Sequence, residues 1–398
     1  MIVWSSLAES GYLAHGTGFA LIHAVSKLPH IDAIRGVAIL MVVFVHAAQA
    51  HGKLGTSFDL LARYGQMGVQ LFFVASAYTL CLSAERRATE TQPLLKYTLR
   101  RFFRLAPMYY VGIVLYAGLA FAGAFAANPH APVAADYTSA NVAANVLLLH
   151  GSYAPGNNVI VPGGWSIGTE VAFYAVFPLL FAGLRRVGHS GLSRLIFVLA
   201  AVASSQGLLL LVAPFGGAVD NGNFYYYHLV TQLPVFAIGM AYYFAVRTPR
   251  RRYSVAYDLV AVAVLSLGAV GLWGLYIGHL YSVIPIVSGL SFVALVEVYR
   301  KVPGLSVPWL TRLGQVSYSV YIVHFAVVWA LSEYAGAGLA EALGAVPSIV
   351  VVFVLGAAGA SAVALLTERF VERPAARLGC RLAARLDAGG AFAKTARR

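Results

Sequence analysis

The sequence predicts an all-α protein, a polytopic membrane bundle of about ten transmembrane helices with both termini in the cytoplasm. Three observations support this fold class. Hydrophobic residues make up 60% of the 398 residues and charged residues only 11%, whereas soluble domains carry about 25% charged residues. The apolar residues occur in runs of about twenty, the length at which a helix crosses a bilayer. Basic residues gather in every second loop, which predicts an even number of crossings.

The expected spans follow one another along most of the chain. They are residues 33–50, 65–83, 105–127, 163–184, 192–213, 226–246, 255–275, 279–299, 313–333 and 347–368. Lys and Arg cluster after the second, fourth, sixth, eighth and tenth spans, whereas residues 128–162, 214–225, 276–281 and 334–346 contain none. The formal charge of +13 therefore reflects topology, and we expect no nucleic-acid partner.

We expect three regions in the chain. Residues 1–29 form an N-terminal cytoplasmic or interfacial tail, residues 30–370 a membrane domain, and residues 371–398 a basic cytoplasmic C-terminal tail. Glu372-Arg373-Pro374, just past the tenth span, is expected to stop the last membrane helix, because proline cannot continue one.

The first expected span carries polar groups that are costly inside a membrane and therefore point to function. Arg35 lies near its cytoplasmic end and His46 in its outer half, with ten residues between them. On a helix that rises about 1.5 Å per residue, the two lie about 16 Å apart along the axis. Arg35 at one end of the helix can thus bind an anion, while His46 at the other end can take part in a reaction. Asp32 precedes Arg35 by three residues, so a helix-end ion pair is the simpler interpretation.

The fourth expected span runs from outside to inside and carries Glu170 about two turns from its outer end. This places His46 and Glu170 at similar depth. An imidazole suits proton abstraction near neutral pH, and a carboxylate beside it would orient the ring. We therefore expect His46 to act as a base that Glu170 orients. The alternatives are a structural hydrogen bond for His46 and, for Glu170, an ion pair that locks helices together.

Two other groups of polar residues share a helix face. Arg101 and Arg104 lie at the cytoplasmic entrance of the third span with a spacing that suits a phosphate group, although ordinary positive-inside topology also accounts for them. Ser317, Tyr321 and His324 lie on one face of the ninth span. They either line a polar cavity or hydrogen-bond between helices.

Taken together, the motifs resemble those of the acyltransferase-3 family of integral membrane O-acyltransferases. The motifs are Asp32-x-x-Arg35 with His46, the segment from Gly68 to Ser76, Arg101-x-x-Arg104, the segment from Trp165 through Glu170 to Tyr174, the run from Ser317 through Tyr321 to His324, and Glu372-x-Pro374. The resemblance implies transfer of an acyl group, commonly acetyl from acetyl-CoA, to a hydroxyl of an extracytoplasmic glycan or lipid. It also implies that Arg35 and His46 are essential and that Arg101 and Arg104 serve the acyl donor.

We therefore predict an O-acyltransferase of the bacterial plasma (inner) membrane that takes an acyl group from cytoplasmic acyl-CoA, with acetyl-CoA as the first candidate. The expected site has His46 and Glu170 as catalytic residues, Arg35, Arg101 and Arg104 as donor-binding residues, and Asp32, Ser76, Trp165, Tyr174, Ser317, Tyr321 and His324 as cavity-lining residues. We expect no metal and no bound cofactor, with the acyl-CoA as co-substrate. The expected partners are the bilayer and a glycan or lipid-linked acceptor, and a homo-oligomer is left open.

Two alternatives remain at the level of sequence. A small secondary metabolite such as a macrolide could replace the glycan as acceptor, with the site open to the cytoplasm. A transporter or flippase could use the same polar residues as a proton or substrate relay. The two classes differ in whether a thioester donor is consumed.

Overall fold

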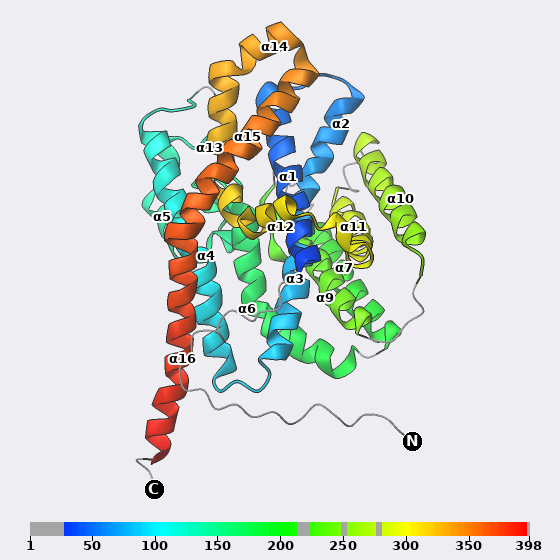
Figure 1. Cartoon of the computed structure of the whole chain (residues 1–398), viewed down its shortest axis with the longest axis vertical. Coiled ribbons are helices and arrows are strands. Elements are labelled where there is room, and N and C mark those ends of the chain that lie inside the picture. Colours follow the sequence, from blue (N-terminus) through cyan, green and yellow to red (C-terminus); the bar gives the residue numbers. More distant parts are fainter. Residues whose placement is uncertain are drawn as a thin grey trace.

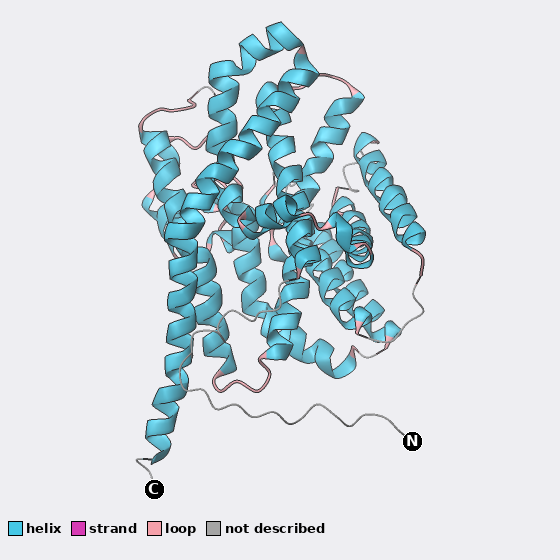
Figure 2. Cartoon of the chain, viewed as in Figure 1, coloured by secondary structure: helices cyan, strands magenta, loops and turns pink. Residues whose placement is uncertain are grey.

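The computed structural model describes residues 28–126, 128–188, 190–212, 223–247, 253–275 and 281–395. These residues form helices joined by turns, and no strand occurs among them (Figure 2). Nine helical segments in the described part of the chain are long and apolar enough to cross a membrane. The predicted all-α membrane bundle is therefore confirmed.

The bundle contains long helices that cross it and short ones that connect or cover them (Figure 1). The long helices are α1 (Pro29–His51), α3 (Gly68–Arg86), α4 (Pro93–Phe121), α6 (Gly164–Val187), α7 (Gly191–Val212), α9 (Leu229–Val246), α10 (Val255–Gly274), α11 (Ile284–Lys301), α13 (Ser317–Leu331), α15 (Ala345–Thr367) and α16 (Arg373–Thr395). The short helices are α2 (Ser57–Tyr64), α5 (Ser139–Val146), α8 (Phe224–Tyr227), α12 (Pro308–Gln315) and α14 (Ala337–Leu343).

We infer that α11 makes a further crossing, although it is not one of the nine apolar segments. It is 18 residues long and carries Glu297, Arg300 and Lys301 in its last two turns. At its end the Lys301 ammonium donates to the carbonyl of Tyr253 at 3.2 Å and pairs with Asp258 at 2.5 Å. Both partners lie at the start of α10, so α11 returns to the side from which α10 departs. If α11 is counted as a crossing, the described helices cross ten times, the even number that the charge pattern predicts.

The basic helix ends lie on one face of the bundle. Arg247 at the end of α9 pairs with Glu85 at the end of α3, and Arg100 in α4 pairs with Glu90 at 2.8 Å. At the opposite end of the bundle, the Ser348 hydroxyl lies 3.4 Å from His51 Nδ1. Because cytoplasmic loops are the basic ones, we assign the first face, hereafter the basic face, to the cytoplasm.

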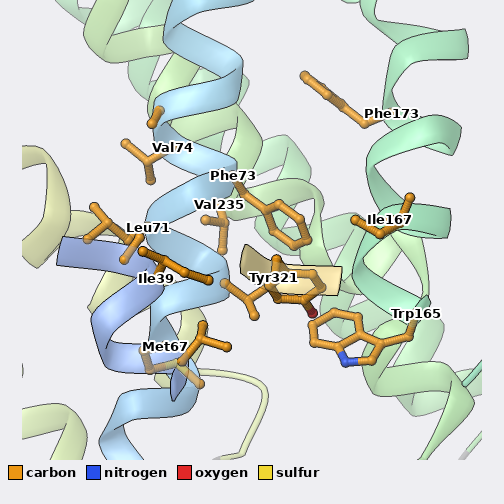
Figure 3. Packing of buried hydrophobic residues seen from close by; sticks show 14 of the residues in the cluster. Ile39, Met67, Leu71, Phe73, Val74, Trp165, Ile167, Phe173, Val235 and Tyr321 are labelled. Carbon is orange, nitrogen blue, oxygen red and sulfur yellow. The ribbon is translucent and has the colours of Figure 1, made fainter. Parts of the chain in front are cut away.

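Helix α1 lies at the centre and packs against α3, α12, α13 and α15. Glycines permit the closest of these contacts. A Cβ at Gly36 would lie 2.4 Å from the carbonyl oxygen of Leu310, and one at Gly68 would lie 2.4 Å from that of Ala38. Small residues let membrane helices approach backbone to backbone. Apolar side chains of α3, α6 and α9 fill the space beside α1 (Figure 3).

Two expectations about helix ends are wrong. The ninth expected span is two helices, because the chain bends at Val316 and α12 lies across the start of α1 (Figure 1). The expected stop at Glu372-Arg373-Pro374 is absent, since a π-helical turn (Glu368–Glu372) carries α15 into α16, which packs against α4. Proline is tolerated in the first turn of a helix, where its missing N–H has no partner to lose. The C-terminal region up to Thr395 is therefore a docked helix.

Helix α6 starts inside the bundle, beneath a segment that folds over it. The backbones of Gly151 and Gly168 touch, so a Cβ at Gly151 would lie 2.4 Å from the Gly168 carbonyl carbon. His150 is fully buried, and its Nε2 lies 3.0 Å from the carbonyl oxygen of Gly164 and therefore donates to it. Tyr109 stacks on the His150 ring and donates to Asn145 at 2.6 Å. These contacts place the first turn of α6 below the outer surface.

We predict that reporter fusions will confirm the number of crossings. Fusions ending at residues 140 and 340 should report the outside, and those ending at residues 88, 254 and 302 the cytoplasm. Alkaline phosphatase, active only outside, and green fluorescent protein, fluorescent only inside, give opposite signals at each position. An outside signal at 302 would show that α11 does not cross.

We predict that His150 makes stability depend on pH. Burial lowers the pKa of His150 to about 4, whereas an unfolded histidine has a pKa of about 6.5. Below that value the unfolded chain binds a proton that the folded protein excludes, so stability is full above pH 6.5 and falls as the pH drops toward 4. The loss should approach about 3 kcal/mol. Unfolding of the detergent-solubilised protein across this pH range measures it.

The matched controls are His150→Gln and His130→Gln. Unfolding of the His150→Gln variant should depend less steeply on pH than that of the parent. His130 is exposed on the same side of the protein, so His130→Gln should leave the slope unchanged. Equal slopes for parent and His150→Gln would contradict the prediction.

Candidate active site

Three cavities follow one another from the basic face toward the outer face. The entrance cavity lies among the end of α3, the start of α4 and the end of α6, with a volume of about 260 Å³. The inner cavity, about 70 Å³, lies deeper along the same helices and reaches α1 and α13. The outer cavity, about 800 Å³, lies beyond it, between the outer half of α1 and the segment that covers α6. Each helix thus contributes to successive cavities at successive depths.

The entrance cavity is strongly basic. It is lined by the guanidinium groups of Arg87, Arg100, Arg101 and Arg185 and by one carboxylate, Glu90. The Arg101 guanidinium lies 5.6 Å from the centre of the Tyr174 ring, and its Nε is buried without a hydrogen-bond partner among the described residues. Such a cavity can receive several phosphate oxygens, because guanidinium groups bind phosphate through paired N–H donors.

The inner cavity is narrow and holds charges of both signs. Glu170 accepts hydrogen bonds from the Ser76 and Tyr174 hydroxyls, both at 2.6 Å. Arg35 and Arg104 line the same space, and Arg35 donates to the Thr79 hydroxyl at 3.4 Å. A volume of about 70 Å³ holds only a few water-sized groups. An extended chain can pass through it, whereas a nucleotide base cannot.

The outer cavity is wide and lined by aromatic rings and amides. The rings are those of Trp165, Phe224, Tyr226, Tyr227, Tyr321 and Phe325, and the amides those of Gln49, Gln66, Gln70, Asn128, Asn157 and Asn158. His46 lies on its wall. Aromatic faces offer apolar contact and amides offer both donors and acceptors. This combination suits a ligand with many hydroxyl groups.

One ring nitrogen of His46 is in a hydrogen bond with a neighbouring amide. Its Nδ1 lies 2.8 Å from the side-chain oxygen of Gln49, so we assign the proton to Nδ1, and Nε2 keeps its lone pair. The ring packs against Phe325 and His324, with ring centres 4.2 and 5.2 Å away. His324 Nδ1 donates to the Tyr321 carbonyl at 2.7 Å. This leaves His324 Nε2 buried without a hydrogen-bond partner among the described residues.

The inner and outer cavities meet at Tyr321 and Val69, which line both. The Tyr321 hydroxyl donates to the carbonyl of Gly163 at 2.9 Å and accepts from Ser166 at 2.8 Å. These bonds hold the ring beside Trp165 at the start of α6 (Figure 3). A group that moves from the inner cavity to His46 must pass this ring.

Comparison with known proteins identifies the family. The family model described as "Acyltransferase domain" matches residues 28–365, which is most of the chain. The chain belongs to the acyltransferase-3 family. It is therefore a membrane enzyme that transfers acyl groups. No solved structure matches it significantly.

Several curated relatives are similar along most of this acyltransferase. Acyltransferase MdmB of Streptomyces mycarofaciens is 24% identical over 76% of this chain and 80% of its own length. Exopolysaccharide production protein ExoZ of Rhizobium meliloti is 26% identical over 84% and 94%. O-acetyltransferase OatA of Staphylococcus aureus is 25% identical over 92% of this chain but only 60% of its own length.

The expected pairing of His46 with Glu170 is wrong. His46 lines the outer cavity, whereas Glu170 lines the inner cavity with Arg35. The expectation assumed that α6 begins at the outer surface. Because the segment around His150 covers its start, Glu170 lies nearer the basic face. Gln49 takes the place beside the imidazole that the carboxylate was expected to fill.

Gln70 presents an unsatisfied acceptor at the outer cavity. The carbonyl of Tyr226 can only accept, so the Gln232 amide that lies 2.7 Å away donates to it. The Gln232 oxygen then accepts from the Gln70 amide nitrogen at 3.1 Å. This leaves the Gln70 oxygen without a hydrogen-bond partner among the described residues, although the side chain is only 1% exposed. An amide oxygen only accepts hydrogen bonds, so a donor such as a hydroxyl group of a ligand would satisfy it.

The remaining expected site residues divide among the cavities. Ser76, Tyr174 and Ser317 line the inner cavity, Trp165 the outer, and Tyr321 both. Asp32 and His324 line none of the three cavities described above: Asp32 accepts from Gln315 at the α12 contact, and His324 is fully buried beside His46. The donor residues are also divided, since Arg101 lines the entrance cavity and Arg35 and Arg104 the inner one.

Four residues of the site were missed from the sequence. Arg87 and Arg185 belong to clusters that the positive-inside rule explains, so nothing marked them as lining a cavity. Gln49 follows His46 by three residues, a spacing at which helical side chains meet, and this signal was available. Gln70 lies within the motif from Gly68 to Ser76, but its role depends on its partner Gln232, which is on a distant helix.

Proposed function

We propose that this acyltransferase moves an acyl group, in the first instance acetyl, from cytoplasmic acyl-CoA to a hydroxyl of a surface or exported glycan or glycolipid. The observation that carries the proposal is the alignment of a basic entrance, a narrow passage and a wide hydroxyl-binding cavity, with His46 on the wall of the last. Two relatives support an acceptor of this kind by their names: ExoZ is an exopolysaccharide production protein and OatA an O-acetyltransferase.

The entrance cavity is suited to the charged end of the donor. Arg101 and Arg185 would bind phosphate groups, and Arg87 would add donors, although Arg87, like Arg100, also pairs with Glu90. The thin arm that carries the thioester would extend through the inner cavity past Arg35 and bring the acyl carbon to Tyr321. The narrowness of the inner cavity explains how the bulky part of the donor stays on the cytoplasmic side.

The transfer step follows from the protonation of His46. An acceptor hydroxyl donates its proton to Nε2 while its oxygen attacks the thioester carbonyl. The new C–O bond forms, the C–S bond breaks, and the leaving thiolate takes the proton from Nε2. Gln49 holds the proton on Nδ1, so that Nε2 is the basic nitrogen. An alternative route has Nε2 attack first and carry the acyl group to the hydroxyl, and the same geometry serves it.

Gln70 would select the acceptor. Its unsatisfied oxygen would accept a hydrogen bond from a second hydroxyl of the acceptor and so orient the hydroxyl that reacts. An acceptor without such a donor would leave a buried oxygen unpaired, which costs about 1–3 kcal/mol. The aromatic rings of the outer cavity would contact the apolar faces of the same molecule.

The experiment that tests the function uses membrane vesicles from strains that carry or lack the gene, supplied with acetyl-CoA labelled in the acetyl group. Label should enter a surface glycan or glycolipid only where the gene is present, and free CoA should accumulate in proportion. Equal labelling in both strains would reject the proposal. Movement of an acceptor across the membrane without use of acetyl-CoA would favour a transporter or flippase.

We predict that His46→Gln lowers the transfer rate 10²- to 10⁴-fold, because glutamine accepts no proton at neutral pH. Gln49→Leu should lower it about tenfold, the equivalent of one lost hydrogen bond. Gln49→Glu, which still accepts from Nδ1, should stay closer to the parent. Initial rates with labelled acetyl-CoA measure all three. A normally inserted His46→Gln enzyme within about tenfold of the parent would exclude this mechanism.

We predict that Gln70→Leu shifts the enzyme from transfer to hydrolysis. Its total thioester cleavage should be close to that of the parent, whereas the ratio of transferred acetyl to free acetate should fall about tenfold. Gln66→Leu is the matched control, since Gln66 lines the same cavity one turn away on the preceding segment. Equal ratios for the two variants would show that Gln70 has no special part in acceptor binding.

A further inference from the structure

A fourth cavity lies apart from the path described above. This lateral groove, about 800 Å³ in volume, is bounded by α7, α9, α10 and α11 and shares no lining residue with the other three cavities. Helix α7 packs mainly on α9, and α10 mainly on α11. Helix α10 stands at the edge of the bundle (Figure 1). The groove therefore has α9 and α11 as its floor and opens between two peripheral helices, where the bilayer would lie.

The groove is apolar along one part and charged along the other. Its apolar lining comprises Leu195, Val198, Ile238, Ala241, Leu290 and Val293. Its charged lining comprises Arg194, Arg247, Asp258, Glu297, Arg300 and Lys301, at the basic ends of the helices. The apolar part lies deeper in the membrane and the charged part at the cytoplasmic end. A phospholipid of the cytoplasmic leaflet has its chains and its headgroup in the same order.

The charged part carries an excess of positive charge. Its four cations face two carboxylates in the lining, and one of the four, Arg247, also pairs with Glu85 outside it. Arg300 uses Nε and Nη2 to bind Glu297, at 3.1 and 2.5 Å. A guanidinium has five N–H donors, so others remain for a second anion. The Arg300 and Arg247 side chains are 43% and 50% exposed.

We propose that the lateral groove binds an anionic phospholipid of the cytoplasmic leaflet, independently of the acyl-transfer function proposed above. Its phosphate would lie at Arg247 and Arg300, and one acyl chain would lie along the apolar lining beside Ala241. Basic pockets between membrane helices on the cytoplasmic side are suited to anionic headgroups. A free phosphate would use the charged part but leave the apolar part empty, so the lipid accounts for the whole groove.

The test is native mass spectrometry of the full chain in detergent with phosphatidylglycerol, phosphatidylcholine or inorganic phosphate. The parent should retain one phosphatidylglycerol under activation that removes phosphatidylcholine. Arg300→Gln should weaken this binding about fivefold, the contribution of one basic residue near a headgroup. Ala241→Phe should abolish it, because the ring would fill the space for the chain.

Two matched variants lie outside the groove and should bind like the parent. Arg312→Gln removes a guanidinium that pairs with Glu368 at 3.0 Å, as Arg300 pairs with Glu297. Ala200→Phe adds a ring to the exposed side of α7. Equal retention of the two lipids, or loss that is no greater in the groove variants than in the matched ones, would overturn the proposal. Retention of inorganic phosphate as strong as that of phosphatidylglycerol would also overturn it. So would the finding that the parent is a dimer and that only Ala241→Phe dissociates it, because the groove would then be an interface between two copies of the chain.

Discussion

The arrangement of the whole site depends on the buried start of helix α6. Inside a bilayer no water is available, so backbone groups need partners within the protein, and the first N–H groups of a helix lack one by default. Here the carbonyls of Val161 and Gly163 accept from the N–H groups of Gly164 and Ser166. His150 and the contact between two glycines cover the turn from above. The helix can therefore begin in the interior without exposed polar backbone.

Because α6 starts inside the bundle, its first residues face the outer cavity and its next turns face the inner cavity. Trp165 and Gly163 face the outer cavity, while Glu170, one to two turns further on, faces the inner one. Tyr321 is bonded to Gly163 and Ser166 and lies where the two cavities meet. In the proposed reaction, water and acceptor reach His46 from outside, while the donor reaches Tyr321 from inside. Because Tyr321 and His46 both line the outer cavity, an acyl group that passes the Tyr321 ring enters the cavity of the histidine.

The arginines of the basic face do more than orient the chain in the membrane. The arginines that predict the cytoplasmic side also line the entrance cavity and the lateral groove. Many of them are paired, as Arg100 is with Glu90 and Arg300 with Glu297, and such pairs keep the guanidinium groups in place. A guanidinium bound to one carboxylate still offers donors to a phosphate. The same charges can thus orient the chain in the membrane and recruit anionic ligands.

The sequence by itself determined the fold class, the topology and the residue types of the site. Apolar runs of helical length and the alternation of basic loops are local signals, since each depends only on neighbours along the chain. The family motifs likewise pointed to Arg35 and His46, on one helix. What only the tertiary structure decided is the depth of α6, the separation of Glu170 from His46, the pairing of Gln70 with Gln232, and the groove beside α10. These depend on contacts between segments far apart in the chain, such as His150 with Gly164 and Tyr109, and no periodicity or spacing within a single helix records them.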